Sequence, residues 1–243
     1  MKALKLLAQP AKLMRRGAGG IDPTGSRLVF ASLDGDQEER GAKILESFLG
    51  CPVEPLRTRT SSSNPAAGLI VDCQTANNFS DLGALLHVAV RKTAIRRGGR
   101  LLVLGAVVDG KNASVDEAII PEACEGFIRS LAKEVGSNGV TANLLLSHSQ
   151  SSGAADVVLS SVLPSARFLL SGEAAFITGQ RVDVDTALFQ EHPTGLSGQR
   201  CVVTGAARGI GRATAAALAE QGCGDLLLVS LKKKKWSSRP STH

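Results

Sequence analysis

The sequence of 243 residues contains no tyrosine, one tryptophan and seven phenylalanines, so a catalytic tyrosine is excluded at every position. It also lacks an apolar run approaching the roughly 18 residues of a membrane span, which argues against a membrane protein. No CxxC pair and no histidine at ligand spacing accompany the cysteines, which argues against zinc and against a disulfide scaffold. We expect a cytoplasmic chain with buried free thiols at its five cysteines, Cys51, Cys73, Cys124, Cys201 and Cys223.

Acidic residues are missing from the first part of the chain, where five basic residues precede the first acid, Asp22. The net charge of +6 comes largely from this segment and from the run Lys232 to Lys235. No stretch interleaves basic residues with stacking aromatics, so we expect no nucleic-acid partner. Residues 1–24 are interpreted as a basic leader arm of the domain, with an organellar import signal as the alternative.

Short apolar runs alternate with segments of helical period along most of the chain. Continuous apolar strands between helices predict a parallel sheet covered on both faces, so the fold class is α/β, a doubly wound (Rossmann or flavodoxin-like) domain. The expected strands are Arg27–Leu33, Gly68–Cys73, the run RLLVLGAV from Arg100, Thr141–Leu146 and Gln180–Val184. The expected helices are Glu38–Leu49, Asp81–Arg97 with a stop at Gly98-Gly99, Val115–Val135 and Ala155–Leu170.

The pattern indicates two parts in sequence. Residues 25–186 form the first α/β domain, and residues 187–197 have turn residues without period, as in a linker. Residues 198–231 restart the alternation as the first βαβ unit of a second Rossmann domain. Its elements are a strand at Gln199–Thr204, a helix at Gly209–Gln221 and a strand at Asp225–Val229. Residues 232–243 are of low complexity and are predicted to form a disordered tail.

The strongest local motif is CVVTGAARGIGRATAAALAEQG, where a buried strand leads into a glycine-rich turn and an alanine-rich helix. Gly205 permits the tight turn, Gly209 lets the backbone approach a pyrophosphate, and Gly211 allows helix and strand to lie close. The helix N-terminus supplies N–H donors for phosphates. The predicted cofactor-binding residues are Gly205, Ala207, Arg208, Gly209, Ile210, Gly211 and Ser230.

The end of the second strand distinguishes the two nicotinamide cofactors, because an acid there binds the ribose 2′-hydroxyl of NAD. The strand ends in Leu228, Val229, Ser230, Leu231 and Lys232, without an acid. A serine and a lysine suit a 2′-phosphate, so NADP is favoured, with NAD as the alternative.

TGAARGIG at Thr204 to Gly211 is similar to the TGxxxGxG motif of short-chain dehydrogenases/reductases. The first domain resembles the later half of the same family in three segments, GGRLLVLGAV, EGFIRSLAKEVGSNGVTANLL and RFLLSGEAAFITGQRVDVD. A degenerate reductase-like domain before a second reductase domain resembles the high-molecular-weight 3-oxoacyl-acyl-carrier-protein reductases. The resemblance implies reduction of a 3-oxoacyl thioester to a 3-hydroxyacyl thioester by hydride transfer, and we expect a homo-oligomer.

The resemblance also implies a catalytic serine, tyrosine and lysine, and this sequence departs from all three. Those positions fall on Ala106, Glu117 and Pro121. The first strand leads into SLDGDQEER, whose acids would repel a pyrophosphate. We therefore predict no catalytic and no metal-binding residue, and an inactive chain whose second domain is C-terminally truncated.

Two other functions are consistent with the sequence. A complete but inactive first domain predicts a non-catalytic interaction or dimerisation protein, and the alternation also fits a flavodoxin-like electron carrier, which SLDGDQEER disfavours. Among the remaining polar residues, His148 is expected in a loop with Ser147 and Ser149, unlike a nucleophile elbow. Asp183 and Asp185 are expected to face solvent or the linker.

Overall fold

The structure is a computed structural model, and it describes residues 26–59, 64–76, 78–92, 94–108, 114–149, 155–185 and 196–230. The chain divides into two compact units, unit 1 from Met1 to Phe189 and unit 2 from Gln190 to His243. The predicted leader arm, most of the linker and the C-terminal tail lie outside the described residues. Within the described part, no helix is long and apolar enough to cross a membrane.

Unit 1 is built on one parallel sheet of six strands in the order β2-β1-β3-β4-β5-β6. The strands are β1 (Leu28–Ser32), β2 (Val53–Pro55), β3 (Ala66–Asp72), β4 (Ile95–Val108), β5 (Thr141–Ser149) and β6 (Arg181–Asp185). The strand order reverses between β1 and β3, which is where an open α/β sheet forms its binding crevice. The predicted doubly wound fold is confirmed.

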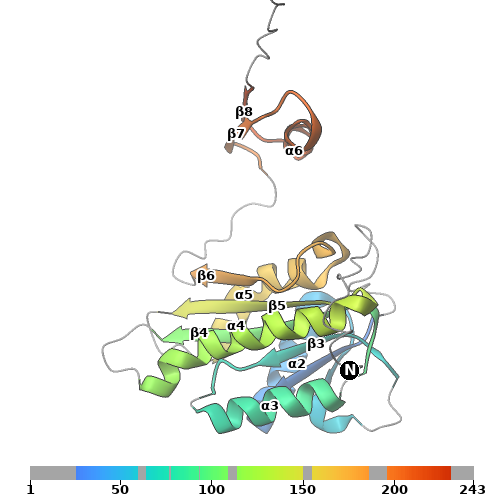
Figure 1. The fold of residues 1–243 in the computed structure, drawn as a ribbon, viewed down its shortest axis with the longest axis vertical. Helices are drawn as coiled ribbons and strands as arrows, with labels where there is room; N and C mark the ends of the chain where they lie inside the picture. The colour runs from blue at the N-terminus through green and yellow to red at the C-terminus, as the bar shows by residue number, and fades with distance from the viewer. Residues whose placement is uncertain are drawn as a thin grey trace, which may run out of the picture. The chain divides into compact units, whose positions relative to one another are not determined.

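Helices cover both faces of this sheet, as Figure 1 shows. Helices α3 (Phe79–Lys92) and α4 (Val115–Val135) lie on one face, and α2 (Gly35–Leu49) and α5 (Ala155–Leu170) lie on the other. Short 3₁₀ turns η1 (Leu56–Thr58), η2 (Gly136–Asn138) and η3 (Gly172–Ala174) complete the connections. Neighbouring residues of the buried strands enter opposite cores. Leu69 joins the α3/α4 side, and Ile70 joins the α2/α5 side.

The start of β4 differs from the prediction. Residues 95–97 were assigned to a helix that stops at Gly98-Gly99, but α3 ends at Lys92 and β4 already begins at Ile95. The glycines make a bulge, since Ala66 pairs with Ile95 whereas Gly68 pairs with Arg100. Gly98 has φ +71°, a conformation that glycine adopts without strain. The prediction from the helical period was wrong here, because pairing with a neighbouring strand overrides the local pattern.

Strand β2 was missed by the sequence pattern, because it has only three residues and ends in Pro55. It is an edge strand, a position where the lack of a proline N–H costs no ladder hydrogen bond. Strand β5 is longer than predicted, and His148 lies on it rather than in a loop.

Two buried polar side chains, one on β4 and one on β5, form hydrogen bonds to the backbone of neighbouring chain segments. The amide of Asn143 donates from Nδ2 to the carbonyl of Ile177 at 3.0 Å and accepts from the N–H of Gln180 at 3.1 Å. Arg100 is 1% exposed and donates to the carbonyls of Gly98 and Ser171. These contacts satisfy backbone groups that would otherwise be buried without partners.

Unit 2 is described by itself as β7 (Arg200–Thr204), α6 (Gly209–Glu220) and β8 (Asp225–Val229). The two strands pair in parallel, with Val202 opposite Leu227. Val203, Ala206 and Ala215 form its small buried core. The βαβ order that the sequence predicted for this segment is present.

Candidate nucleotide site and the positions of the catalytic residues

The glycine-rich turn of unit 2 connects the end of β7 to the start of α6. Gly205 has φ +68° and Gly209 has φ +59°, so both lie in the left-handed region that favours glycine. A Cβ atom built at either residue would meet no atom of the described residues within 4 Å. The surface of this turn is therefore open to the approach of a ligand.

Gly211 has a different role from the first two glycines. A Cβ atom at this position would lie 2.5 Å from the carbonyl oxygen of Gly205 and 2.8 Å from its carbon. Both are backbone atoms, so the first turn of α6 can approach the end of β7 only with glycine here. This is the close contact that the spacing predicted.

The N-terminus of α6 carries no charge that would repel an anion. Arg208, its N-cap residue, is extended at φ −160° and ψ 169° and makes no side-chain cap hydrogen bond. The first turn of α6 contains no acidic residue. Because the first N–H groups of a helix have no partners within the helix, this end can donate to phosphate oxygens.

The remaining predicted cofactor residues of unit 2 are solvent-exposed. Ala207 and Arg208 lie in the turn, Ile210 is 87% exposed at the start of α6, and Ser230 follows the end of β8. Lys232, which favoured NADP in the sequence, lies outside the described residues. The described end of β8 thus offers a hydroxyl and no carboxylate.

The helix N-terminus that follows the first strand of unit 1 carries acidic residues. The N-cap of α2 is Asp34, whose carboxylate accepts a hydrogen bond from the N–H of Asp36 at 2.8 Å. Asp36 and Glu38 put two further acids into the first turn. Glu38 is buried and accepts from the N–H of Arg57 at 2.9 Å and, more weakly, from its guanidinium. A phosphate at this helix end would face carboxylates, as predicted from SLDGDQEER.

Polar groups without partners gather at the ends of β1 and β3. Ser32 is 7% exposed and lies opposite Asp72 in the strand register. The hydroxyls of Ser32 and Thr75 and the amide nitrogen of Gln74 have no hydrogen-bond partner within the described structure. Asp72 accepts from the N–H of Gln74 at 3.1 Å, and burial raises its pKa to about 6. This end of the sheet in unit 1 is polar without being a phosphate site.

The three positions assigned to catalytic groups lie on β4 and α4 of unit 1. Ala106 lies near the end of β4, opposite Ser147 of β5, whose buried hydroxyl donates to the carbonyl of Gly105 at 3.2 Å. Glu117 and Pro121 are on α4, and Pro121 is buried within the helix. A methyl group and a proline ring cannot donate a proton or carry a positive charge.

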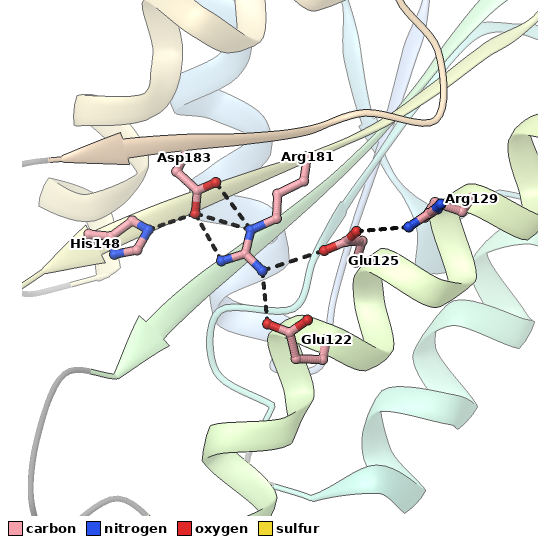
Figure 2. Close-up of polar contacts among 6 residues, drawn as sticks. All are labelled: Glu122, Glu125, Arg129, His148, Arg181 and Asp183. Atoms are coloured by element: carbon pink, nitrogen blue, oxygen red, sulfur yellow. Dashed lines mark hydrogen bonds and ion pairs between the residues drawn. The ribbon is translucent and has the colours of Figure 1, made fainter.

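A charged network joins α4 to the edge strand β6 and to the end of β5 (Figure 2). The guanidinium of Arg181 donates to both oxygens of Asp183, and to Glu122 on α4 at 2.9 Å. Nε2 of His148 lies 2.7 Å from Oδ1 of Asp183. The hydrogen bond from Arg181, and then the one from His148, lower the pKa of Asp183. Asp183 is exposed to solvent, as expected, and the pairing of β5 with β6 also brings it against His148 and Arg181.

Comparisons with known proteins come from sequence and from structure, and no protein-family model matches the chain. The 3-oxoacyl-[acyl-carrier-protein] reductase FabG of Escherichia coli K12 is 30% identical over 133 residues, which cover 46% of this chain and 54% of that protein. The FabG of Pseudomonas aeruginosa is 28% identical over 205 residues, covering 71% and 79%. The chain thus spans about half the length of the first of these relatives.

Solved structures agree in fold. A short-chain dehydrogenase/reductase from Serratia marcescens superposes with a TM-score of 0.51 at 14% identity, covering 68% of this chain and 98% of that one. A blue fluorescent protein from a metagenomic library, solved in complex with NADPH, superposes with a TM-score of 0.50 at 14% identity. At this identity the solved structures establish the fold alone.

In sequence the chain is similar to 3-oxoacyl-[acyl-carrier-protein] reductases, and in fold it is similar to short-chain dehydrogenases/reductases. Sequence reasoning located the glycine-rich turn, and by resemblance it assigned the catalytic positions to Ala106, Glu117 and Pro121. Sequence reasoning missed the contact between His148 and Asp183. The only signal for it in the sequence was that both residues lie at or after the end of an apolar strand segment. Sequence reasoning also did not find that Cys73 and Cys124 lie in the same buried core.

Proposed function

We propose that unit 2 binds a nicotinamide dinucleotide at its glycine-rich turn, with NADP preferred over NAD, and that unit 1 is a non-catalytic reductase domain. The observation that carries the proposal is the contrast between two helix N-termini. That of α6 has no side-chain cap and no acid in its first turn, whereas that of α2 is capped by Asp34 and followed by two acids. Only the first is suited to a pyrophosphate.

The residues of unit 2 fit such a cofactor in further respects. The open turn at Gly205 and Gly209 allows its backbone to approach phosphates, and Arg208 adds a positive charge beside them. Ser230 after β8 offers a hydroxyl toward a ribose or its 2′-phosphate, with no carboxylate to repel the phosphate. A bound nicotinamide cofactor supplies hydride chemistry.

Unit 1 does not supply the groups that such a reduction needs. The proton donor of this reductase type is absent from the whole sequence, which has no tyrosine. Ala106 has no hydroxyl and Pro121 has no amine, and the neighbouring hydroxyl of Ser147 is fully buried and donates to a backbone carbonyl. The relatives named above are 3-oxoacyl thioester reductases, and we propose that this chain does not turn over that substrate by itself.

Nucleotide titration of the full chain tests the first part. We expect calorimetry with millimolar NADP to give one site per chain, with weaker binding of NAD. Gly211→Val places side-chain atoms against the backbone of Gly205 and should abolish the binding, while the control Asp36→Asn in unit 1 should leave it unchanged. Absence of binding at millimolar nucleotide, or binding that survives Gly211→Val, would contradict the assignment.

Turnover measurements test the second part. The chain, supplied with NADPH and an acetoacetyl thioester, should consume no more cofactor than a protein-free control, whereas an FabG enzyme in the same cuvette conditions should consume it readily. Sustained turnover by the purified chain, proportional to its concentration, would overturn the proposal that unit 1 is non-catalytic.

An interaction protein is the second candidate, and one surface observation favours it. Val115 and Ile119 are one helical turn apart on α4 and are 74% and 42% exposed, so they form an apolar strip on unit 1. We propose that the chain associates through unit 1 with a second copy or with a complete reductase of the same type. Light scattering after chromatography, alone and with such a reductase, measures this association; a monomer under both conditions would contradict it.

A further inference from the structure

Helix α6 covers one face of the two-stranded sheet of unit 2 and leaves the other face exposed (Figure 1). Successive side chains of a strand point to opposite faces of the sheet. On β7, Val203 is 7% exposed beneath α6, whereas its neighbour Val202 is 65% exposed. On β8, Leu226 packs against the small core under α6, whereas Leu227 is 60% exposed. Val202 and Leu227, which are opposite each other in the strand register, therefore form an apolar centre on the exposed face.

Unit 1 shows how a parallel sheet is covered when it is complete. Every residue of β1 and β3 is buried, because helices pack on both faces of the sheet. In β7 and β8 the only buried residue is Val203, and the core of the described part of unit 2 consists of this residue, Ala206 and Ala215. Parallel sheets occur almost only with both faces covered, so the exposed face of unit 2 is expected to bind another surface.

The strand register arranges the side chains of this exposed face in three rows across the two strands. The first row pairs a positive with a negative charge, the middle row is apolar, and the last row combines a hydroxyl with a valine. In this order the rows are Arg200 with Asp225, Val202 with Leu227, and Thr204 with Val229. All six residues are exposed. The two charges thus lie at one end of the face, and the apolar groups lie at its centre and at its other end.

We propose that this face is an interaction surface for a second copy of the chain, with two copies of unit 2 packed face to face. A two-fold axis that runs parallel to the strands, between the two faces, places β7 over β8 of the other copy and keeps each row opposite itself. Arg200 then lies opposite Asp225 of the partner subunit, and Val202 lies opposite Leu227 of the partner subunit. Because of the symmetry each contact is made twice, so both charges and both apolar groups meet a complement.

The charges distinguish this arrangement from the alternative symmetric one. A two-fold axis that runs across the strands would place the first row of one copy over the last row of the other. Asp225 would then lie against Val229 of the partner subunit. Burying a carboxylate against methyl groups is costly, so the axis parallel to the strands is favoured. The strands of the two sheets are then aligned, as they are in common face-to-face packings of sheets.

The size of the face predicts a weak and reversible association. Each strand has five residues, so the face is about 17 Å long and two strands wide. Stable complexes bury roughly 800 Å² on each partner, which a face of this size does not reach. Since α6 covers the opposite face, the contact leaves the glycine-rich turn accessible and does not require bound nucleotide. It also differs from the α4 strip of Val115 and Ile119, which belongs to unit 1.

Sedimentation velocity of the full chain, without nucleotide and over a range of protein concentrations, tests the proposal. We expect a monomer at low micromolar concentration and a dimer fraction that grows toward millimolar concentration. Leu227→Lys places a charge in the apolar row and should abolish the dimer. The matched control Ala216→Lys adds the same charge at an exposed position of α6, outside the face, and should leave the dissociation constant unchanged.

Charge reversal tests the contact between Arg200 and Asp225. Arg200→Asp and Asp225→Arg should each raise the dissociation constant at least about tenfold, because each substitution places like charges opposite one another. An equimolar mixture of the two variants should restore the dimer, since both acidic positions of one variant then lie opposite basic positions of the other. This restoration also shows that both variants are folded.

Three results would each overturn the proposal. The first is a chain that stays monomeric up to millimolar concentration, and the second is an equal effect of Leu227→Lys and Ala216→Lys. The third is a mixture of the two charge-reversed variants that associates no better than either variant alone. An association that survives Leu227→Lys and is lost with Ile119→Lys would assign the contact to unit 1, and it would overturn the proposal in the same way.

Discussion

Replacement of the buried carboxyl of Asp72 by an amide should stabilise unit 1 at neutral pH and not at acidic pH. Asp72 is 6% exposed at the end of β3, and burial raises its pKa from the ordinary value of 3.8 to about 6. Its carboxylate accepts a hydrogen bond from the N–H of Gln74, which an asparagine oxygen can also accept. Asp72→Asn therefore keeps this contact and removes the charge.

The sign follows from proton linkage. Between pH 3.8 and about 6 the folded protein holds a proton on Asp72 that the unfolded chain has lost, so stability falls as the pH rises through this window. Since one pKa unit corresponds to about 1.4 kcal/mol, the ionised carboxylate destabilises the fold by about 3 kcal/mol above pH 6. This is the free energy of unfolding that Asp72→Asn should recover at pH 7.5.

Urea unfolding followed by far-ultraviolet circular dichroism measures the effect. We expect Asp72→Asn to raise the free energy of unfolding by about 3 kcal/mol at pH 7.5 and by much less near pH 4. The exposed control Asp36→Asn should change it by less than about 0.5 kcal/mol at either pH. An equal change at both pH values, or a loss of stability at pH 7.5, would show that Asp72 is not a buried, uncompensated carboxyl.

Three further predictions concern packing and the polar contacts. Asn143→Ala should cost about 2–4 kcal/mol in urea unfolding, because it orphans backbone groups of the turn 177–180; a loss below 1 kcal/mol would contradict that role. Gly83→Ala on α3, where the added Cβ has open space, should raise the free energy of unfolding by about 0.5–1 kcal/mol. Gly41→Ala should lower it by about 1–3 kcal/mol, because its Cβ would lie 2.5 Å from a buried phenylalanine ring. Equal effects of the two substitutions would contradict the close contact at Gly41. Arg181→Gln should lower the free energy of unfolding by less than about 1 kcal/mol, with a correspondingly small drop in the melting temperature. The loss should be smaller still in high salt, because salt screens exposed ion pairs.

Much of the fold could be predicted because its signals are local. Apolar runs such as GLIVDC mark strands that are buried on both faces, and α4 and α5 have the bounds that their period predicted. Errors occurred where pairing with a neighbouring strand overrides the local pattern. At residues 95–99 a bulge against β3 replaces the predicted helix end, and β2 is too short to leave a pattern at all.

The sequence by itself determined that a tyrosine is missing, and it indicated the turn at which we propose that a phosphate binds. The absence of tyrosine needs no structure, and the glycine-rich turn is a local feature whose strand, turn and helix are consecutive in the chain. The acidic segment after β1 was likewise sufficient to predict a helix end unsuited to phosphate. Each of these conclusions depends on neighbours within about one turn of the backbone.

Only the tertiary structure decided which distant residues meet. Cys73 and Cys124 are far apart in the sequence and lie in the same buried core. His148 and Asp183 meet because β5 and β6 are adjacent strands. The burial of Asp72, and with it the rise in its pKa, comes from the strands and helices that exclude water around it. Contact and desolvation are properties of the packed fold, and the order of residues along the chain does not contain them.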